Sequence, residues 1–130
     1  MSLSSTFTKE ERISGKKDVD CLFSEGKSFI AYPLRVIYVE KELTSDLPVS
    51  ILVSVSKKRF KRAVKRNRVK RLVRESYRLN KSELSNFLSL QKKALLVAFL
   101  YLNNELCSYP EMEIAMKKAL SMLQEKLASL

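Results

Sequence analysis

The chain has 130 residues, of which 45% are hydrophobic, and 25 Lys and Arg against 14 Asp and Glu give it a formal net charge of +11. A chain of this length is expected to form one domain, residues 1–130, that buries about two thirds of its unfolded surface and needs no metal or disulfide for stability. It has no histidine and only two glycines, which removes the commonest general base and metal ligand and leaves little material for a Gly-rich phosphate loop. The sequence therefore offers no sign of an active site of its own.

The expected compartment is the cytoplasm. Cys21 and Cys107 are the only cysteines and the amino terminus resembles no secretory leader, so both are predicted to be reduced structural thiols rather than a redox pair. The longest apolar run, residues 94–102, has nine residues. A bilayer crossing needs about 20, so no membrane association is predicted.

In chain order, residues 1–9 are rich in Ser and Thr and are predicted to be a flexible tail. A short amphipathic helix is predicted from Lys16. Its apolar face is formed by Val19, Leu22 and Phe23. Ser14 can cap the start of this helix, and Gly26 suits the position just beyond its end. A helix this short needs a sheet to pack on.

Two strands are predicted next. Residues 34–39 alternate with one mostly apolar side, and residues 29–32 can form a preceding segment broken at Pro33. Residues 49–56 follow a polar loop and again alternate. They place Ile51, Val53 and Val55 on one face and Ser50, Leu52, Ser54 and Ser56 on the other. The serine-lined face is either an exposed edge or the floor of a groove.

The segment 57–81, KKRFKRAVKRNRVKRLVRESYRLNK, concentrates the positive charge of the chain. It holds 13 of the 25 Lys and Arg and a single acid, so it carries +12, whereas the other 105 residues, with 12 basic and 13 acidic side chains, sum to −1. Such a run is often only a solvated helix face. This one also shows helical periodicity, which favours a specific role.

A helix over residues 63–80 has two distinct faces at 3.6 residues per turn. The face suited to core packing contains Val69, Leu72, Val73, Ser76 and Tyr77. The opposite face contains Asn67, Lys70, Arg71, Arg74 and Arg78. That stripe is about 16 Å long, and because like charges held together repel, a polyanion such as nucleic acid explains it better than solubility does. Arg62, Lys65 and Arg66 turn toward the apolar side, so the first turns are expected to overhang the core edge.

The rest of the chain is predicted as a polar connection over residues 81–93, a strand over residues 94–101 and a closing helix. The strand is apolar throughout and is therefore expected to be central and covered on both faces. Residues 108–111, SYPE, resemble a capping box with proline in the first turn. The inner face of the closing helix contains Met112, Met116, Ala119, Leu120, Leu123 and Leu127. Core packing is favoured over a binding groove for this stripe.

The predicted order is α-β-β(-β)-α-β-α, which is typical of a two-layer α+β sandwich of helices on a mixed sheet of three to four strands. If the strands on either side of the basic helix are parallel neighbours, they form a crossover unit with it. Such units are almost always right-handed.

Residues 54–58, SVSKK, and 61–78, KRAVKRNRVKRLVRESYR, closely resemble the signature of the bacterial ribonuclease P protein subunit. Arg66, Asn67 and Arg68 stand where that family has its RNR motif. The resemblance extends loosely to residues 12–13 and 23–28. Two departures occur: Val19 stands where a phenylalanine is common, and Phe60 lies in a stretch where many members have a glycine.

The resemblance implies the ribosomal protein S5 domain 2-like fold, with an unusual left-handed βαβ crossover that carries the RNR helix. It also implies a partner, the catalytic RNA, with which the family's protein removes the 5′ leader from precursor tRNA. Mg²⁺ is expected to be bound mainly by the RNA, which carries the hydrolysis, and none by the protein. The chain is expected to be a cytoplasmic monomer within the ribonucleoprotein and to have no catalytic residue.

The resemblance also assigns residues. The predicted RNA-binding set is Lys57, Lys58, Arg62, Lys65, Arg66, Asn67, Arg68, Lys70, Arg71, Arg74 and Arg78. The predicted leader cleft, between the first helix and one sheet face, contains Val19, Phe23 and Tyr38, or Ile37 in place of Tyr38 if the strand register shifts by one. Arginine forks pair with phosphate oxygens, and aromatic faces suit unpaired bases. Core packing remains an equal alternative for the two aromatic residues.

Two other functions compete. A non-catalytic ribosomal-type RNA-binding protein would use an α+β domain of this charge equally well. A membrane-surface protein could use the basic helix, but the face opposite the charges is needed by the core.

Overall fold

The computed structural model describes residues 16–42 and 48–128. The predicted tail, residues 1–9, and the predicted cap Ser14 lie outside these residues. The elements are α1 (Lys16–Glu25), β1 (Lys27–Ala31), β2 (Leu34–Glu42), β3 (Val49–Ser54), α2 (Ala63–Asn80), α3 (Ser82–Leu90), β4 (Lys93–Tyr101) and α4 (Tyr109–Ala128).

The four strands form one mixed sheet in the order β1-β2-β4-β3. β2 is antiparallel to both β1 and β4, whereas β3 and β4 are parallel. The register places Ile37 opposite Ala98, and Ala98 opposite Leu52 on its other side. β4 is therefore a central strand of the described sheet, together with β2, as its continuous run of hydrophobic residues predicts.

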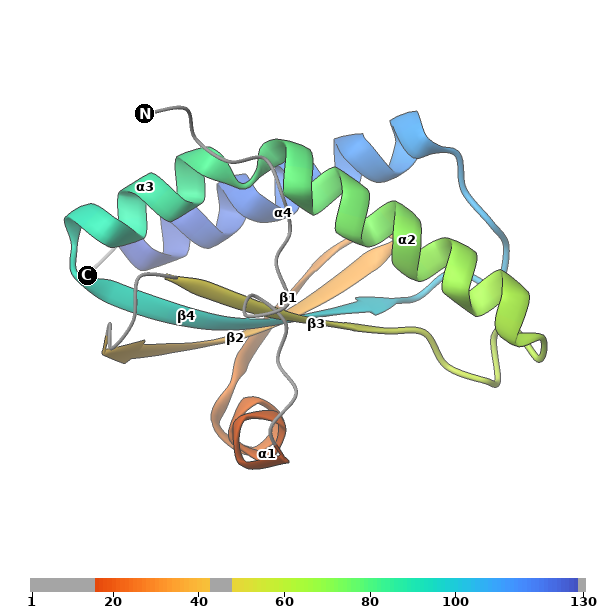
Figure 1. Ribbon diagram of the computed structural model, residues 1–130, viewed down its shortest axis with the longest axis horizontal. Coiled ribbons are helices and arrows are strands. Elements are labelled where there is room, and N and C mark those ends of the chain that lie inside the picture. The colour runs from red at the N-terminus through yellow and green to blue at the C-terminus, as the bar shows by residue number, and fades with distance from the viewer. Residues whose placement is uncertain (1–15, 43–47, 129–130) are drawn as a thin grey trace.

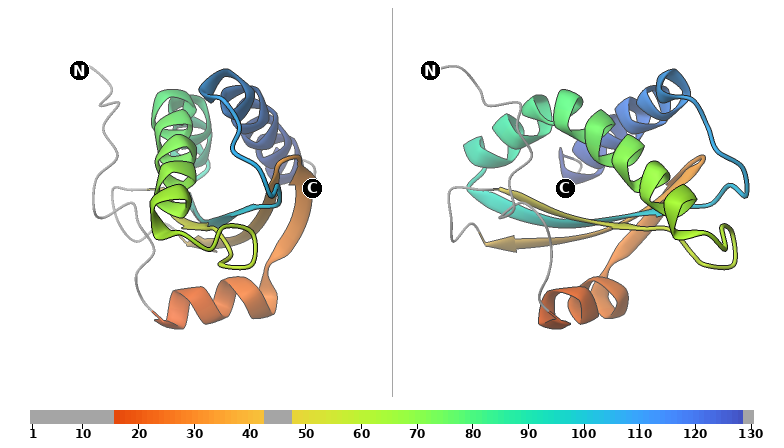
Figure 2. Two further views of the ribbon diagram at one scale, coloured as in Figure 1. Left: turned by 90° about the vertical axis from the view of Figure 1, so that its right-hand side faces the viewer. Right: turned by 45° about the vertical axis from the view of Figure 1, so that its right-hand side comes forward.

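Helices cover the two faces of the sheet unequally (Figures 1 and 2). α2, α3 and α4 pack on one face and enclose the larger core cluster, which includes Val73, Phe99 and Met116. α1 packs alone on the other face, over β2 and β4, where Leu22 joins a smaller cluster. The predicted layer of helices on a mixed sheet is confirmed, and α1 adds partial cover on the second face.

The connection from β3 to β4 is left-handed. In Figure 1, both strands point to the right, β3 lies in front of β4, and the connecting helices α2 and α3 lie above the sheet. Figure 2 shows the same order from the end of the strands. A right-handed crossover would place β4 in front of β3 in this view. The handedness that the family resemblance implies is confirmed, and the general right-handed rule fails here.

α2 spans the predicted 63–80 and buries the predicted face. Val69, Val73, Ser76 and Tyr77 are buried, and Leu72 is half-buried against the same cluster. The ring of Tyr77 lies 6.1 Å from that of Phe99 on the central strand. Burying each Val side chain contributes on the order of 1.5–3 kcal/mol, which offsets the repulsion among the cations outside.

α3 corrects the prediction of a polar connection over residues 81–93. Its residues 82–90, SELSNFLSL, bury Leu84 and Leu88 and leave Phe87 half-buried against the core. The spacing i, i+3, i+4 is helical, but three serines and an asparagine make the segment resemble a loop. The crossover therefore contains two helices, joined at Lys81.

The ends of α1 and α4 explain two local sequence features. Gly26 follows α1 as predicted, yet its φ is not positive. A Cβ there would lie 2.6 Å from Cγ2 of Ile37 and would clash with the Leu22 carbonyl, so glycine permits a close approach. At α4, the Ser108 N–H donates to Glu111 (3.1 Å) and the Glu111 N–H donates to Ser108 Oγ (3.3 Å). The predicted capping box is confirmed.

Candidate nucleic-acid interface

The outward face of α2 is a regular helical stripe of cations. Asn67 and Arg71 are exposed, and Lys70, Arg74 and Arg78 are half-buried beside the core-facing residues. Because one rigid helix carries them all, their spacing is fixed over about 16 Å. The predicted geometry of this face is confirmed, and the RNA contact itself remains a prediction.

Arg78 has an acidic partner one turn earlier in α2. Its Nε donates to Glu75 Oε1 at 2.7 Å. The Glu75 carboxylate neutralises part of the charge at this end of the helix. The cations of α2 from Lys65 to Arg71 precede Glu75 and lie nearer its amino terminus.

The first turns of α2 extend beyond the sheet. Val64 is 78% exposed, and Lys65 and Arg68 are exposed around it. Arg62 at the N-cap makes no side-chain capping bond, and the first turn has no acid. Lys57 and Lys58 are also exposed, in the turn before the helix. This arrangement confirms the predicted overhang and presents cations beside helix N–H groups that favour anions.

Arg66 has an internal role that sequence reasoning did not find. Its Nη1 donates to the carbonyl of Phe60 at 2.8 Å and to that of Lys61 at 2.9 Å. The side chain therefore folds back over the turn that leads into α2. One guanidinium has five N–H donors in all, so these two bonds leave donors for a second partner.

The turn before α2 rests on Phe60, which is 6% exposed. Its ring centroid lies 6.1 Å from that of Tyr101 at the end of β4. Arg59 in the same turn donates from Nη1 to Asn104 Oδ1 at 2.9 Å. The aromatic residue that departs from the family pattern thus packs under the helix start, and Arg59 joins the basic turn to the β4–α4 connection.

A hollow of about 460 Å³ opens at this junction. It is lined by Arg59, Phe60, Lys61, Arg62 and Lys65 on one side and by Asn104, Glu105 and Leu106 on the other. Four cations face one carboxylate, so the hollow favours an anion. The predicted interface included Arg62 and Lys65 but neither Arg59, Lys61 nor the β4–α4 connection.

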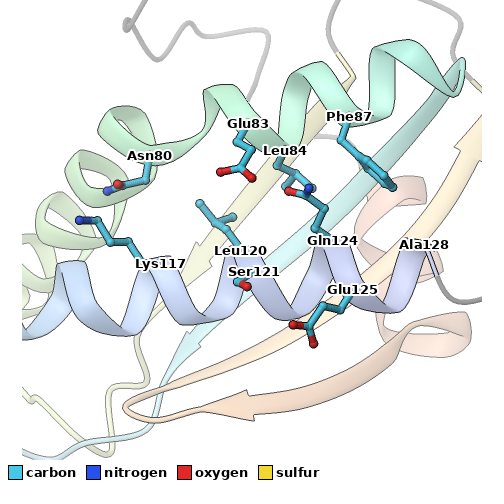
Figure 3. Close-up of a pocket in the computed structure, with 10 residues that line it drawn as sticks. All are labelled: Asn80, Glu83, Leu84, Phe87, Lys117, Leu120, Ser121, Gln124, Glu125 and Ala128. Carbon is cyan, nitrogen blue, oxygen red and sulfur yellow. The ribbon is translucent and has the colours of Figure 1, made fainter.

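A second hollow, of about 480 Å³, lies between α3 and α4 on the helical layer (Figure 3). Its charged lining residues are Glu83, Lys117 and Glu125. Figure 3 shows Glu83 extending from α3 toward α4. Two carboxylates against one ammonium make this surface unsuited to a phosphate backbone, so a nucleic-acid interface is expected at the other hollow and along α2.

The sheet face under α1 holds only part of the predicted leader cleft. Phe23 is 53% exposed on α1, and Val19 is half-buried against the smaller cluster. Tyr38 points to the opposite face, where its ring meets that of Phe29 edge-on at 6.0 Å. Because side chains alternate across a strand, Ile37 faces α1 instead. The placement of Tyr38 beside α1 is therefore wrong, and the alternative register holds.

Among residues 16–42 and 48–128, no three His, Cys, Asp or Glu side chains gather closely enough to hold a metal ion. Within the same residues, no helix combines the length and apolar character that a bilayer crossing requires.

Comparison with known proteins gives consistent matches. The family model described as ribonuclease P matches residues 7–124. The ribonuclease P protein component of Porphyromonas gingivalis is 48% identical over 116 residues, which cover 87% of this chain and 82% of that protein. That of Chlorobaculum tepidum is 40% identical over 94 residues, which cover 67% of this chain and 61% of that protein.

Two solved structures share the fold. The ribonuclease P protein from Staphylococcus aureus superposes with a TM-score of 0.65 at 21% identity, over 87% of this chain and 94% of that chain. The protein from Thermotoga maritima gives a TM-score of 0.52 at 23% identity, over 89% and 90% respectively.

Proposed function

Since the chain belongs to the ribonuclease P protein family, we propose that it binds the catalytic RNA of the enzyme through the outward face of α2 and the basic turn before it. It is the protein subunit of a tRNA-processing endoribonuclease whose catalysis is carried by RNA. A ribosomal-type protein, the alternative, is not favoured by these relatives.

The observation that carries the proposal is the display of charge on one rigid element. α2 buries its apolar face against the sheet and leaves Asn67, Arg71 and Arg74 on the other side. Arginine pairs with two phosphate oxygens at once, and Asn67 can donate and accept at one place, which suits it to fixing the register of the RNA. Cations held at fixed spacing lower the repulsion between RNA segments that fold against each other.

The second part of the proposal concerns precursor tRNA. The single-stranded 5′ leader would lie on the sheet face beside α1, with Phe23 as the exposed aromatic for an unpaired base. Ile37 and Val19, which lie against Leu22, would contribute apolar contact rather than stacking. The leader would thus be held on the opposite side of the sheet from the α3–α4 hollow.

The Mg²⁺ that hydrolysis requires would be held by the RNA. The basic residues of this chain would reduce the amount of Mg²⁺ needed, because they neutralise phosphates that free cations must otherwise screen. The protein would act as a monomer in the cytoplasm, within the ribonucleoprotein.

Reconstitution tests the main proposal. The purified chain alone should cleave nothing, and adding it to its cognate RNA should raise removal of the leader at low Mg²⁺. The double variant Arg71→Ala, Arg74→Ala should lose most of this effect, whereas Lys118→Ala on α4 should keep it. Leader removal that is unchanged when the wild-type protein is added would rule the proposal out.

The leader surface needs a separate measurement. Phe23→Ala should weaken binding of a precursor with a leader by about 1–3 kcal/mol, the usual contribution of one stacked base, and leave binding of mature tRNA unchanged. Leu90→Ala, which removes a residue that is 86% exposed on α3, is the matched control. Equal losses for the two tRNA forms would place the leader elsewhere.

A further inference from the structure

The hollow at the amino end of α2 is a preformed site built from two segments far apart in sequence. The turn before α2 and the β4–α4 connection lie side by side at one end of the sheet (Figure 1), and the Arg59–Asn104 hydrogen bond joins them. Tyr101, which is buried, supports both: its ring meets Phe60, and its hydroxyl donates to the Glu105 carbonyl at 2.7 Å. These contacts hold the walls in place without any ligand.

The hydrogen bonds at the rim add to this rigidity. Asn103 Oδ1 accepts from the Glu105 N–H at 3.2 Å and shapes the connection. Burial raises the pKa of the Tyr101 phenol above its ordinary value, so the hydroxyl remains a donor at physiological pH. Arg66 fixes the opposite wall through the Phe60 and Lys61 carbonyls. A site that is ordered in advance loses little entropy when a ligand enters.

The two walls differ in chemistry. One carries Lys61, Arg62 and Lys65, which suit a phosphate. The other carries the half-buried Leu106, the Asn104 amide and the Glu105 carboxylate, which can contact a base face and accept from base N–H groups. The Arg59 guanidinium, held by Asn104, offers a flat surface on which a base can stack.

We propose that this hollow receives one unpaired nucleotide of the RNA subunit, with its phosphate on Lys61, Arg62 and Lys65 and its base against Arg59 and Leu106. The inference rests on the proposed function, because it names the part of the RNA that the basic turn recognises. The surface of an RNA duplex is convex, so a duplex cannot enter a hollow, whereas a single splayed-out nucleotide can. The volume of about 460 Å³ is within the range of sites for small ligands.

The test separates the base from the phosphate. Asn104→Ala removes the partner of Arg59 and one polar wall without changing charge, and Asn86→Ala, an exposed position on α3, is its neutral control. Lys61→Ala removes a phosphate contact, and Lys118→Ala is its charged control. Affinity of each full-length protein for the cognate RNA is measured across salt concentrations, and the RNA is probed chemically, base by base, with and without protein.

Asn104→Ala should weaken binding about tenfold with an unchanged salt slope, because stacking and base contacts release no counterions. Lys61→Ala should reduce the slope by about 0.7–0.9. With wild-type protein, one unpaired base should become protected, and with Asn104→Ala it should become reactive again while its backbone stays protected. Circular dichroism melting of each variant shows whether it is folded.

Three outcomes would overturn the proposal while leaving the proposed function intact. In the first, wild-type protein binds but protects no unpaired base. In the second, Asn104→Ala binds as tightly as Asn86→Ala. In the third, the protected base is unaffected by Asn104→Ala, which would show that the hollow holds only a backbone phosphate. Failure of wild-type protein to bind the RNA would instead reject the proposed function.

Discussion

The three residues of the RNR motif differ in their surroundings within the protein. Arg66 donates to two backbone carbonyls of the preceding turn, whereas Asn67 and Arg68 are exposed beside it. Arg66 thus shapes the surface on which the others are displayed. Besides any contact with RNA, Arg66 therefore has a structural role: it holds the turn before α2 in place.

Because these two hydrogen bonds would be lost, Arg66→Ala is expected to destabilise the protein. We expect the free energy of unfolding in urea to fall by about 1 kcal/mol, because two carbonyls lose a charged donor at a partly exposed site. Arg68→Ala removes the same charge from an exposed position and should change it by less than about 0.5 kcal/mol. If both variants unfolded at the same urea concentration, the hydrogen bonds of Arg66 would have no net effect on stability.

Gly26 is the second residue that matters for local packing, because its lack of a side chain lets α1 lie close to β2. Gly26→Ala would place a methyl group against the Leu22 carbonyl and Ile37, so α1 must shift on the sheet. Overpacking of this kind costs roughly 1–3 kcal/mol. Thermal unfolding should show a lower midpoint than for Ser28→Ala, an exposed strand position. A midpoint equal to that of wild-type protein would mean that α1 adjusts freely.

At the scale of elements, α4 depends on its capping box. The Ser108 backbone N–H, followed by its hydroxyl, holds the pKa of Glu111 below its ordinary value. A carboxyl whose pKa is lowered by folding contributes stability that is present above its unfolded pKa and is lost as the pH falls through the folded value. The helix start is therefore sensitive to acid.

Comparing Glu111→Gln with wild-type protein isolates this effect. Wild-type protein should be the more stable at neutral pH, and the difference should shrink as the pH falls below about 4.3, the ordinary pKa of glutamate, because the folded carboxyl becomes protonated only below that pH. Glu125→Gln, on the last turns of α4, is the matched control. A difference that is independent of pH would show that the ionised carboxylate is not what caps α4.

At the scale of the whole molecule, the charge is divided between one segment and the rest. Residues 57–81 carry +12 and the remainder −1, so orientation toward a polyanion is built into the chain. Glu83 and Glu125 line the α3–α4 surface and disfavour its contact with RNA.

This division predicts which lysines and arginines matter for binding. Arg71→Ala with Arg74→Ala should reduce the slope of log affinity against log salt by about 1.4–1.8 for the RNA subunit. Lys92→Ala with Lys118→Ala lowers the net charge equally but should leave the slope within error. If both pairs changed the slope alike, total charge rather than the α2 surface would control association.

The elements with strong periodicity were predictable from sequence. α2 matched its expected bounds, and β4 and α4 followed from a continuous apolar run and a regular stripe. α3 was missed because its serines are typical of a loop and its apolar residues gain stability only from contact with β4 and α4. The left-handed crossover came from family resemblance, since no local pattern distinguishes the two hands.

The candidate site was predictable only where it lies on one element. The outward face of α2 follows from helical spacing alone. Tyr38 was misplaced because a shift of one residue reverses the face of a strand, and both β2 faces are apolar. The wall formed by Asn104, Glu105 and Leu106 depends on contacts across more than forty residues of sequence, such as Arg59–Asn104, which no local signal reveals.

The strand order has a consequence for synthesis on the ribosome. β4 lies between β2 and β3, so these two earlier strands have no neighbour in common until the residues up to Tyr101 have emerged. Until then the basic helix is outside the exit tunnel without the central strand on which Tyr77 packs. Nascent chains should therefore expose the basic helix to cellular RNA before the sheet is complete. Early binding to the RNA subunit would protect these partly folded chains from misassembly.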